Sequence, residues 1–205
     1  MKVIVLGGFL GSGKTSVLLE LSKYLVHKLQ GKENSLIIIE NEVGDASIDD
    51  KILGESGLVV TGLNTGCVCC EMTAELNACV NMIQRNLDPE WLIIEASGVA
   101  IPYMIVQTLA MHGRGITSID SIVVEDAERF DKIRRRLPDI VEKQLVGANI
   151  VLLNKVDCVD AEMEQQIKDQ IAEMHPKAML YSVSAEKGIG FSEWERIIGD
   201  ERNDV

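Results

Sequence analysis

Apolar residues along the chain fall into six short runs that alternate with longer segments of helical periodicity. The runs are almost continuous in Val, Ile and Leu, as in the strands of a parallel sheet that is covered on both faces. We expect strands at 2–6, 35–40, 91–95, 119–124, 149–153 and 178–182, and helices near 14–29, 71–86, 102–112, 138–146, 160–174 and 190–198. This alternation predicts an α/β fold, a doubly wound and mainly parallel sheet with helices on both faces.

Local signals support several of the helix starts. Pro102 and Pro138 fit the first turn of a helix, and Asp160 and Ser192 are suitable caps or first-turn residues. The glycine-rich and acidic stretch 41–66 carries no clear helix or strand pattern.

The first expected strand leads into a glycine-rich turn. Residues 7–16 read GGFLGSGKTS and match G-x-x-x-x-G-K-[ST], the P-loop, between a strand and a helix. Glycines let the loop curl so that backbone N–H groups point at an anion, and the helix adds the positive end of its dipole. The expected phosphate-binding residues are Gly8, Gly11, Ser12, Gly13, Lys14, Thr15 and Ser16.

Two of these side chains have separate roles in a P-loop NTPase fold. Lys14 is placed to neutralise the β- and γ-phosphates, and the Thr15 hydroxyl is placed to bind Mg²⁺. A glycine-rich turn with a chance lysine is the alternative, and the strand and helix on either side argue against it.

The sequence Asn154-Lys155-Val156-Asp157 follows the fifth expected strand. In an N-K-x-D turn the Asp157 carboxylate accepts hydrogen bonds from the N1–H and the exocyclic amine of guanine, whereas adenine leaves a buried carboxylate unpaired. Asn154 can tie this turn to the P-loop, and the stem of Lys155 can lie along the base. The same pattern occurs by chance at helix starts, where Asp is a cap, and the chain would then be a P-loop kinase or ATPase. After a strand in a P-loop chain, the pattern favours guanine.

A second turn bears on the same base. Ser184-Ala185-Glu186-Lys187-Gly188 follows the last expected strand and resembles the S-A-K loop of GTPases, whose Ala backbone N–H faces the guanine O6. An ordinary strand-to-helix turn would read the same way. With both other motifs in one chain, Ser184 and Ala185 are expected to be nucleotide-binding residues.

Three of the five cysteines, Cys67, Cys69 and Cys70, lie within four residues. Thiolates at this density suit a soft or borderline metal such as Zn²⁺. They cannot all be core residues, because neighbours on a strand point to opposite faces, and a disulfide between adjacent cysteines would be strained. A redox pair or a tolerated cluster is the alternative. Cys79 and Cys158 are spaced like isolated buried thiols and are assigned no role.

Together the motifs resemble the CobW/HypB/UreG group of GTPases, and within it the CobW type most. In chain order they are GGFLGSGKTS at 7, ENEVGDASID at 40, GCVCC at 66, EASGVAIP at 95, Gln144 before a strand, and NKVD at 154. The resemblance implies a single GTP-binding domain over residues 1–205, without the further C-terminal domain that most CobW proteins carry. It also implies GTP hydrolysis, and slow intrinsic turnover is expected because no arginine occupies a recognised finger position.

CobW-type proteins resemble metallochaperones or metal-insertion factors, so the resemblance implies a client metalloprotein. Carried onto this sequence, it implies Cys67, Cys69 and Cys70 as transition-metal ligands, with Glu40 and Asp45 as possible carboxylate ligands. The metal would be Zn²⁺ or another transition metal such as Co²⁺ or Ni²⁺. Family members often dimerise across the nucleotide face, so a homodimer is a further expectation.

The family's E-x-x-G motif maps to Glu95 and Gly98. It implies that Glu95 acts beside Lys14 in catalysis, near Mg²⁺ or the attacking water, and that the Gly98 backbone senses the γ-phosphate. The chain departs from the family where Val43 replaces a bulkier residue and Asp45 replaces Glu. The alternative function is a GTP-dependent regulatory switch that docks on a partner enzyme and holds a structural metal or none.

Composition narrows the partners. The 205 residues are 46% hydrophobic and 25% charged and carry a net charge of −12, which argues against a nucleic-acid-binding surface. The run Arg134-Arg135-Arg136 is interpreted as a solvated helix face rather than a docking site. No secretory leader or membrane-spanning run is expected, and clustered thiols favour a reducing, cytoplasmic location.

Overall fold

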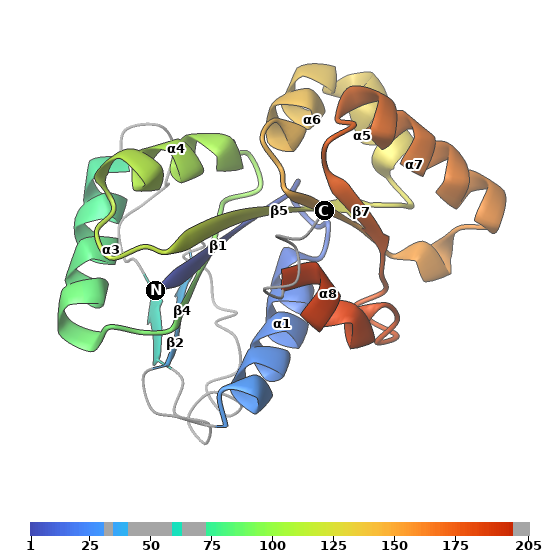
Figure 1. Ribbon diagram of the computed structural model, residues 1–205. Helices are drawn as coiled ribbons and strands as arrows, with labels where there is room; N and C mark the ends of the chain where they lie inside the picture. Colours follow the sequence, from blue (N-terminus) through green and yellow to red (C-terminus); the bar gives the residue numbers. More distant parts are fainter. Residues whose placement is uncertain (31–34, 41–58, 63–72, 199–205) are drawn as a thin grey trace.

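The computed structural model describes residues 1–30, 35–40, 59–62 and 73–198. Within these residues seven strands form one sheet in the order β3-β2-β4-β1-β5-β6-β7 (Figure 1). The strands are β1 (Lys2–Gly7), β2 (Leu36–Glu40), β3 (Val59–Gly62), β4 (Trp91–Glu95), β5 (Ser118–Asp126), β6 (Ile150–Asn154) and β7 (Met179–Ser182). All pairings are parallel, so the carboxyl ends of the strands meet at one edge.

Helices cover both faces of this sheet. They are α1 (Lys14–Lys28), α3 (Thr73–Leu87), α4 (Pro102–His112), α5 (Phe130–Arg136), α6 (Pro138–Leu145), α7 (Ala161–Met174) and α8 (Trp194–Ile198), with 3-10 turns η1 (Val156–Cys158) and η2 (Phe191–Glu193). Helices α1 and α8 pack on one face, and α3 to α7 pack on the other (Figure 1). The expected doubly wound α/β fold is confirmed.

The central strand β1 shows why the apolar runs are continuous. Ile4 and Leu6 belong to the core beneath α1, and Val3 and Val5 belong to the core beneath α3 and α4. All four side chains are fully buried. A strand that is covered on both faces has no solvated side on which polar residues would alternate with apolar ones.

Most expected elements are found with ends that differ by at most two residues. One expected helix is divided, and two elements that were not expected are present. Strand β3 lies in the stretch 41–66, where no element was expected. It has four residues, and among the described strands it pairs with β2 alone. The expectation of one helix at 190–198 is wrong, because the segment divides into η2 and α8. Helix α5 was also missed as an element. It carries the arginine run, and Arg135 and Arg136 are exposed, as expected of a solvated helix face.

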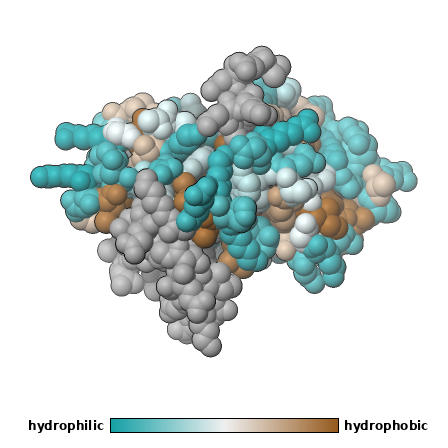
Figure 2. Space-filling model, turned by 60° about the horizontal axis from the view of Figure 1, so that its bottom comes forward, coloured by the Kyte–Doolittle hydropathy of each residue, from teal (hydrophilic) through white to brown (hydrophobic). Residues whose placement is uncertain are grey.

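The expected helix starts are largely confirmed. Pro102 and Pro138 occupy the first turns of α4 and α6, and the Asp160 carboxylate caps α7 by accepting from the Met163 N–H at 2.8 Å. Ser192 instead lies within η2. Among helices of the described residues, none is long and apolar enough to cross a membrane. The face in Figure 2 is mainly hydrophilic, with hydrophobic residues in separate patches.

Candidate nucleotide-binding site

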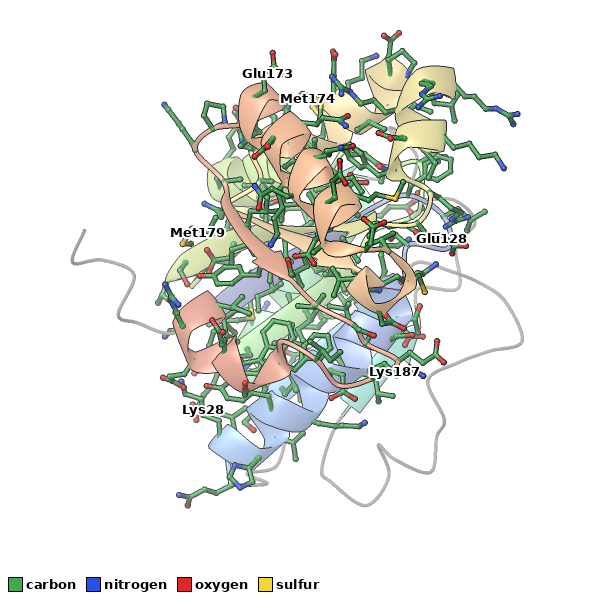
Figure 3. All side chains as sticks on the ribbon, turned by 90° about the vertical axis from the view of Figure 1, so that its right-hand side faces the viewer. Lys28, Glu128, Glu173, Met174, Met179 and Lys187 are labelled. Atoms are coloured by element: carbon green, nitrogen blue, oxygen red, sulfur yellow. The ribbon has the colours of Figure 1, made fainter. Side chains whose placement is uncertain are left out.

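The sequence motifs meet at the carboxyl edge of the sheet. Figure 3 shows this edge from the β7 side: Glu128, after β5, and Lys187, after β7, lie toward one side of the sheet. Met179, at the start of β7, and Lys28, at the end of α1, lie toward the other. The P-loop, Glu95 and the N-K-x-D turn all follow strands, so the parallel pairing collects them at the first of these edges.

The P-loop follows β1 and has a backbone that requires glycine at two positions. Gly8 has φ 136°, and a Cβ there would lie 2.2 Å from the carbonyl oxygen of Val124. Gly13, at the start of α1, has φ 94°, and a Cβ there would lie 2.3 Å from Nδ2 of Asn154. Side chains at these positions would therefore strain the backbone and push neighbouring segments away.

Polar side chains line this loop. Lys14 is buried, and its Nζ lies 3.5 Å from the carbonyl oxygen of Phe9 within the same loop. The Thr15 hydroxyl donates to Oε1 of Glu95 at 3.1 Å, which joins the start of α1 to the end of β4. Ser12 Oγ is buried and has no hydrogen-bond partner among the described residues. A buried hydroxyl without a partner carries a desolvation cost that an acceptor in the loop would remove.

Asn154 connects the two nucleotide motifs. This fully buried side chain donates from Nδ2 to the carbonyl oxygen of Ser12 at 2.9 Å. Its Oδ1 accepts from the backbone N–H of Ala185 at 3.0 Å. The tie to the P-loop that the sequence suggested is present, and it extends to the turn after β7.

Asp157 and the turn at 184–188 lie next to one another. The hydrogen bond from the Ser184 hydroxyl is the main cause that lowers the pKa of the exposed Asp157 carboxyl. The turn itself is more ordered than an ordinary connection, because Ser184 and Ile189 exchange two backbone hydrogen bonds of 3.0 Å. The Ser184 hydroxyl also accepts from the Lys187 N–H at 3.2 Å. The Asp157 carboxyl is therefore ionised at neutral pH and can act as an acceptor.

A buried carboxylate at the end of β5 positions two cations that bind the P-loop. Asp126 is 1% exposed, and its Oδ2 accepts from Nζ of Lys155 at 2.6 Å and from Nε of Arg129 at 2.7 Å. The same two cations donate to successive P-loop carbonyl oxygens, Lys155 to Gly11 at 2.9 Å and Arg129 to Leu10 at 3.0 Å. We call Asp126, Arg129 and Lys155 the P-loop clamp. With these carbonyls held outward, the loop is fixed in its curled form.

Glu125 directly precedes Asp126 on β5, and its side chain points to the opposite face of the sheet. It is 2% exposed, and burial, together with the negative charge of Asp126, raises its pKa to about 8. Its Oε1 has no hydrogen-bond partner among the described residues. The carboxyl is therefore protonated at neutral pH.

Comparison with known proteins identifies the family of this chain. The model of the CobW/HypB/UreG nucleotide-binding domain matches residues 2–182. The chain belongs to the CobW/HypB/UreG family. The matched residues include the P-loop and the N-K-x-D turn.

Two curated relatives of this CobW/HypB/UreG chain have names that refer to zinc. The zinc chaperone YjiA of Escherichia coli is 30% identical over 190 residues, which cover 89% of this chain and 57% of YjiA. The zinc-regulated GTPase metalloprotein activator 1 of Dictyostelium discoideum is 27% identical, covering 88% of this chain and 45% of that protein. The chain thus spans about half the length of these relatives.

Solved structures agree with the fold. The hydrogenase maturation factor HypB of Archaeoglobus fulgidus superposes with a TM-score of 0.65, covering 97% of this chain and 88% of HypB at 18% identity, a likeness of fold alone. The Zn(II)-bound YjiA GTPase of Escherichia coli superposes with a TM-score of 0.59 at 26% identity, covering 88% of this chain and 57% of YjiA.

The E-x-x-G segment of this CobW/HypB/UreG chain packs against the P-loop. Gly98 lies against the backbone of Leu10, and its carbonyl oxygen accepts from Nε2 of the buried Gln144 at 3.1 Å. The same Nε2 lies 3.2 Å from the carbonyl oxygen of Ala100. Gln144 thereby fixes the segment after Glu95 beside the loop, which gives this residue of the family pattern a structural role.

Only part of the expected metal site lies within the described residues. Glu40 ends β2 and is the register neighbour of Glu95 on β4. Asp45, Cys67, Cys69 and Cys70 lie outside the described residues. Among the residues that are described, no group of three or more His, Cys, Asp or Glu side chains could hold a metal ion.

The expectation for the other two cysteines is wrong for Cys158. This thiol is exposed, because it ends the turn η1 on the surface beside Asp157, and its Sγ lies 3.8 Å from Oδ2 of that residue. Local desolvation by the neighbouring turn, followed by the negative charge of Asp157, raises the pKa of the Cys158 thiol although it is exposed. Cys79 is half-buried, and burial raises the pKa of its thiol as well. Both are free cysteines.

Sequence reasoning missed the clamp residues Asp126 and Arg129. One signal was available, since the pair Glu125-Asp126 directly follows an apolar run, where the carboxyl end of a strand was expected. The expected strand ended at residue 124, whereas β5 extends to Asp126. Arg129 carries no such signal, because its contact with Leu10 joins residues 119 positions apart.

Proposed function

We propose that this chain is a GTP-binding and GTP-hydrolysing domain that acts in metal delivery, as a metallochaperone or metal-insertion factor. The observation that carries the nucleotide part is the Asn154 side chain, which bonds to the P-loop and to the turn at Ala185. Asp157 stands beside Ser184 of that turn as an ionised acceptor. An acceptor of this kind is complementary to the two adjacent donors of guanine and not to adenine.

The residues present fit a nucleotide phosphate chain with Mg²⁺. The loop keeps Gly8 and Gly13 where a Cβ would obstruct it, and it holds the unpartnered Ser12 hydroxyl. Thr15 and Glu95, in contact at 3.1 Å, are the residues that would hold Mg²⁺ and its water. Mg²⁺, when bound, would neutralise charge on the β- and γ-phosphate oxygens. Lys14 would add its own charge to the same oxygens, and Glu95 would orient the attacking water.

The metal part of the proposal is supported by the two zinc-related relatives and by the position of Glu40. Strand register places Glu40 beside Glu95, so a ligand at this position would sense the occupancy of the nucleotide site. We infer that the transition-metal ligands are Cys67, Cys69 and Cys70, with Glu40 and Asp45 as carboxylates. Zn²⁺ is the expected ion, with Co²⁺ and Ni²⁺ as alternatives, and the client is a metalloprotein.

The proposal includes a homodimer across the nucleotide face. Leu10, in the P-loop, is 61% exposed, and Val99, which follows Gly98, is 60% exposed. Gly98 packs against Leu10, so Leu10 and Val99 belong to neighbouring segments beside the P-loop. Exposed apolar side chains at a ligand edge are suited to a contact that forms when the ligand is bound.

Metal titration of the nucleotide-free, GDP-bound and GTP-analogue-bound protein tests the function. We expect wild type to bind GTP in preference to ATP, and its Zn²⁺ affinity to change by about 5- to 100-fold between the GDP and GTP-analogue forms, a common range for coupled sites. By linkage, Zn²⁺ must change the affinity for the GTP analogue by the same factor. Co²⁺ and Ni²⁺ are titrated in parallel.

A Cys69→Ser/Cys70→Ser variant is compared with a Cys79→Ser/Cys158→Ser variant, which removes the same number of thiols elsewhere. We expect only the first to lose Zn²⁺ binding while keeping GTP binding. If wild type binds GTP and ATP equally, the nucleotide assignment is wrong. If Zn²⁺ binds tightly but its affinity is the same in the GDP and GTP-analogue forms, the metal-delivery function is rejected. The alternative, a regulatory GTPase with a structural zinc, is then supported.

A further inference from the structure

A second concave site lies away from the nucleotide edge, on the outer side of α3. This groove has a volume of about 690 Å³, within the range of ligand sites, and it is open to solvent. Its lining comes from α3 and from the segment between α4 and β5: Asn77, Ala78, Asn81, Met82, Gln84, Arg85, Asn86, His112 and Arg114. His112 and Arg114 precede the amino end of β5, whereas the nucleotide motifs follow strand carboxyl ends.

The charge of the groove is opposite to that of the protein. The chain carries a net charge of −12, yet no Asp or Glu is among the lining residues, and two arginines are. Neither Arg85 nor Arg114 forms an ion pair with any described residue. Both side chains are exposed. Two guanidinium groups without carboxylate partners leave ten N–H donors for an anion, about five on each.

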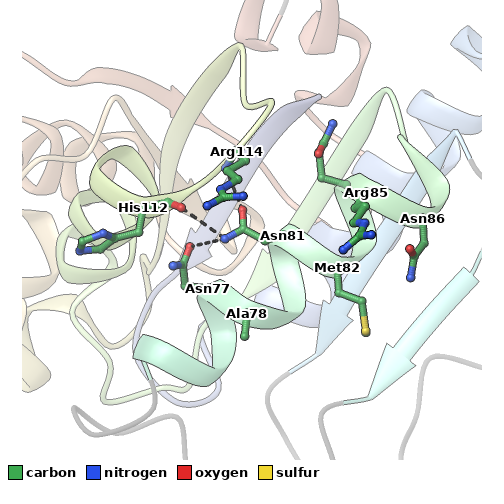
Figure 4. A pocket seen from close by; sticks show the side chains of 9 residues that line it. Asn77, Ala78, Asn81, Met82, Arg85, Asn86, His112 and Arg114 are labelled. Atoms are coloured by element: carbon green, nitrogen blue, oxygen red, sulfur yellow. Dashed lines mark hydrogen bonds between the residues drawn. The ribbon is translucent and has the colours of Figure 1, made fainter.

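The wall of the groove is held by one amide side chain. Asn81 Oδ1 accepts from the backbone N–H of Arg114 at 2.8 Å. Its Nδ2 donates to the carbonyl oxygen of His112 at 3.2 Å (Figure 4). Figure 4 shows Arg114 beside Asn81 of α3, and Arg85 further along α3. Gly115 completes this wall with φ 65°, where a Cβ would lie 2.4 Å from Nε2 of Gln84. The segment that carries Arg114 is therefore fixed against α3.

The shape of the groove indicates an extended ligand. The α3 residues in its lining, from Asn77 to Asn86, form two neighbouring rows along the helix and span about 13 Å at about 1.5 Å per residue. At about 3.3 Å per residue, this length matches some four residues of extended peptide. Asn and Gln amides can pair with both the N–H and the C=O of a peptide backbone. The exposed Met82 adds an adaptable apolar contact.

We propose that this groove binds an extended acidic peptide segment of a partner protein, with Arg85 and Arg114 pairing to Asp or Glu side chains. Guanidinium groups form bidentate contacts with carboxylates, which suits two arginines separated along a peptide. The amides of Asn77, Asn86 and Gln84 would hold the backbone between them. This inference does not depend on the proposed GTPase function, because the groove and the nucleotide motifs lie at different places on the fold.

Fluorescence anisotropy with the full chain tests this site. The probe is a fluorescein-labelled peptide of four Glu residues flanked by Gly, and the matched peptide has Gln in place of Glu. We expect saturable binding of the Glu peptide, at least 10-fold weaker binding of the Gln peptide, and loss of affinity at higher salt. Arg85→Glu/Arg114→Glu should weaken binding at least 10-fold. Arg135→Glu/Arg136→Glu, which makes the same charge change on α5, should leave it within about 2-fold.

Further readouts separate this proposal from other outcomes. Circular dichroism and GTP binding of both variants should match wild type, so a change confined to peptide binding reports the groove. Backbone NMR shifts on adding the peptide should concentrate at Asn77–Asn86 and 112–115. Equal loss in the two variants would mean non-specific attraction and would overturn the proposal. Full competition by millimolar inorganic phosphate would make this a small-anion site, and absence of binding would also reject the peptide.

Discussion

At the scale of single residues, Asn154 has the largest expected effect for its size. Replacing it with Ala removes the bonds to the Ser12 carbonyl and the Ala185 N–H, and leaves a buried carbonyl without its partner. Loss of such bonds costs about 1–3 kcal/mol. We expect Asn154→Ala to weaken GTP affinity about 10-fold, because both loops lose their common support. Isothermal titration with GTP measures the change.

The residue before the same strand supplies a control. Asn149 precedes β6, and its Oδ1 accepts from the backbone N–H of Ser121 at 2.9 Å, far from the P-loop. Asn149→Ala should lower the free energy of unfolding while leaving GTP affinity within about 2-fold. Equal GTP affinity in Asn154→Ala and wild type would contradict the role of Asn154 as a support of the nucleotide site.

Residue types and spacing were sufficient to recognise the P-loop and the N-K-x-D turn, but not the contacts that support them. G-x-x-x-x-G-K-[ST] and N-K-x-D could be recognised because the chemistry of phosphate and guanine restricts which residues can serve. The clamp at Asp126 could not, because an ion pair between distant positions has no local pattern. The buried state of Gln144 is a similar case, since an amide in a helix usually faces solvent.

At the scale of elements, α5 is joined directly to the P-loop. Arg129 is its N-cap residue, and the Arg129 side chain bonds to the Leu10 carbonyl and to Asp126. Arg129→Ala leaves Asp126 with Lys155 as its cation, so the loop should loosen without collapse. We expect GTP affinity to fall about 3- to 10-fold and the unfolding free energy to fall by about 1 kcal/mol, as for loss of a typical hydrogen bond, because the Arg129 side chain is partly exposed.

Arg134 on the same helix is the matched control. Its guanidinium bonds to Gln170 of α7 and has no contact with the P-loop. Arg134→Ala should therefore lower stability and leave GTP binding unchanged in the same titration. If the two variants bind GTP alike, α5 has no influence on the loop.

The elements that sequence predicted well are those with two buried faces. Strands such as β1 and β4 are continuous apolar runs, and a long helix such as α1 follows the P-loop pattern. Strand β3 escaped because four residues at a sheet edge do not exceed the variation of a loop. Helix α5 escaped because only Phe130 and Ile133 of its seven residues are buried, so the charged run dominates its sequence.

At the scale of the whole molecule, Glu125 makes stability depend on pH. Its pKa is raised to about 8 in the folded protein and returns to about 4.5 on unfolding. Between these values the unfolded chain releases a proton that the folded chain keeps, so this group lowers stability as pH rises from about 5 to 8. We expect this contribution to be of order a few kcal/mol, and Glu125→Gln, which mimics the neutral carboxyl, to abolish it.

Urea denaturation at pH 5, 6.5 and 8 measures this contribution. The stability of Glu125→Gln relative to wild type should increase with pH, because only folded wild type must either keep a proton that the unfolded chain releases or bury a charged carboxylate. Glu128→Gln, on the exposed residue three positions later, should follow the pH dependence of wild type. Parallel pH curves for wild type and Glu125→Gln would show that Glu125 ionises normally in the folded protein.

The strand order has a consequence for how the chain reaches its native state. Strand β1 is first along the chain but central in the sheet, and its partners begin only at Trp91 and Ser118. During synthesis its apolar residues therefore wait for more than half of the described chain before both backbone edges are paired. Such non-local pairing slows folding, since loop-closure entropy must be overcome before the contacts form. We therefore expect the P-loop, which follows β1, to take its native form late, after the strands on both sides of β1 are in place.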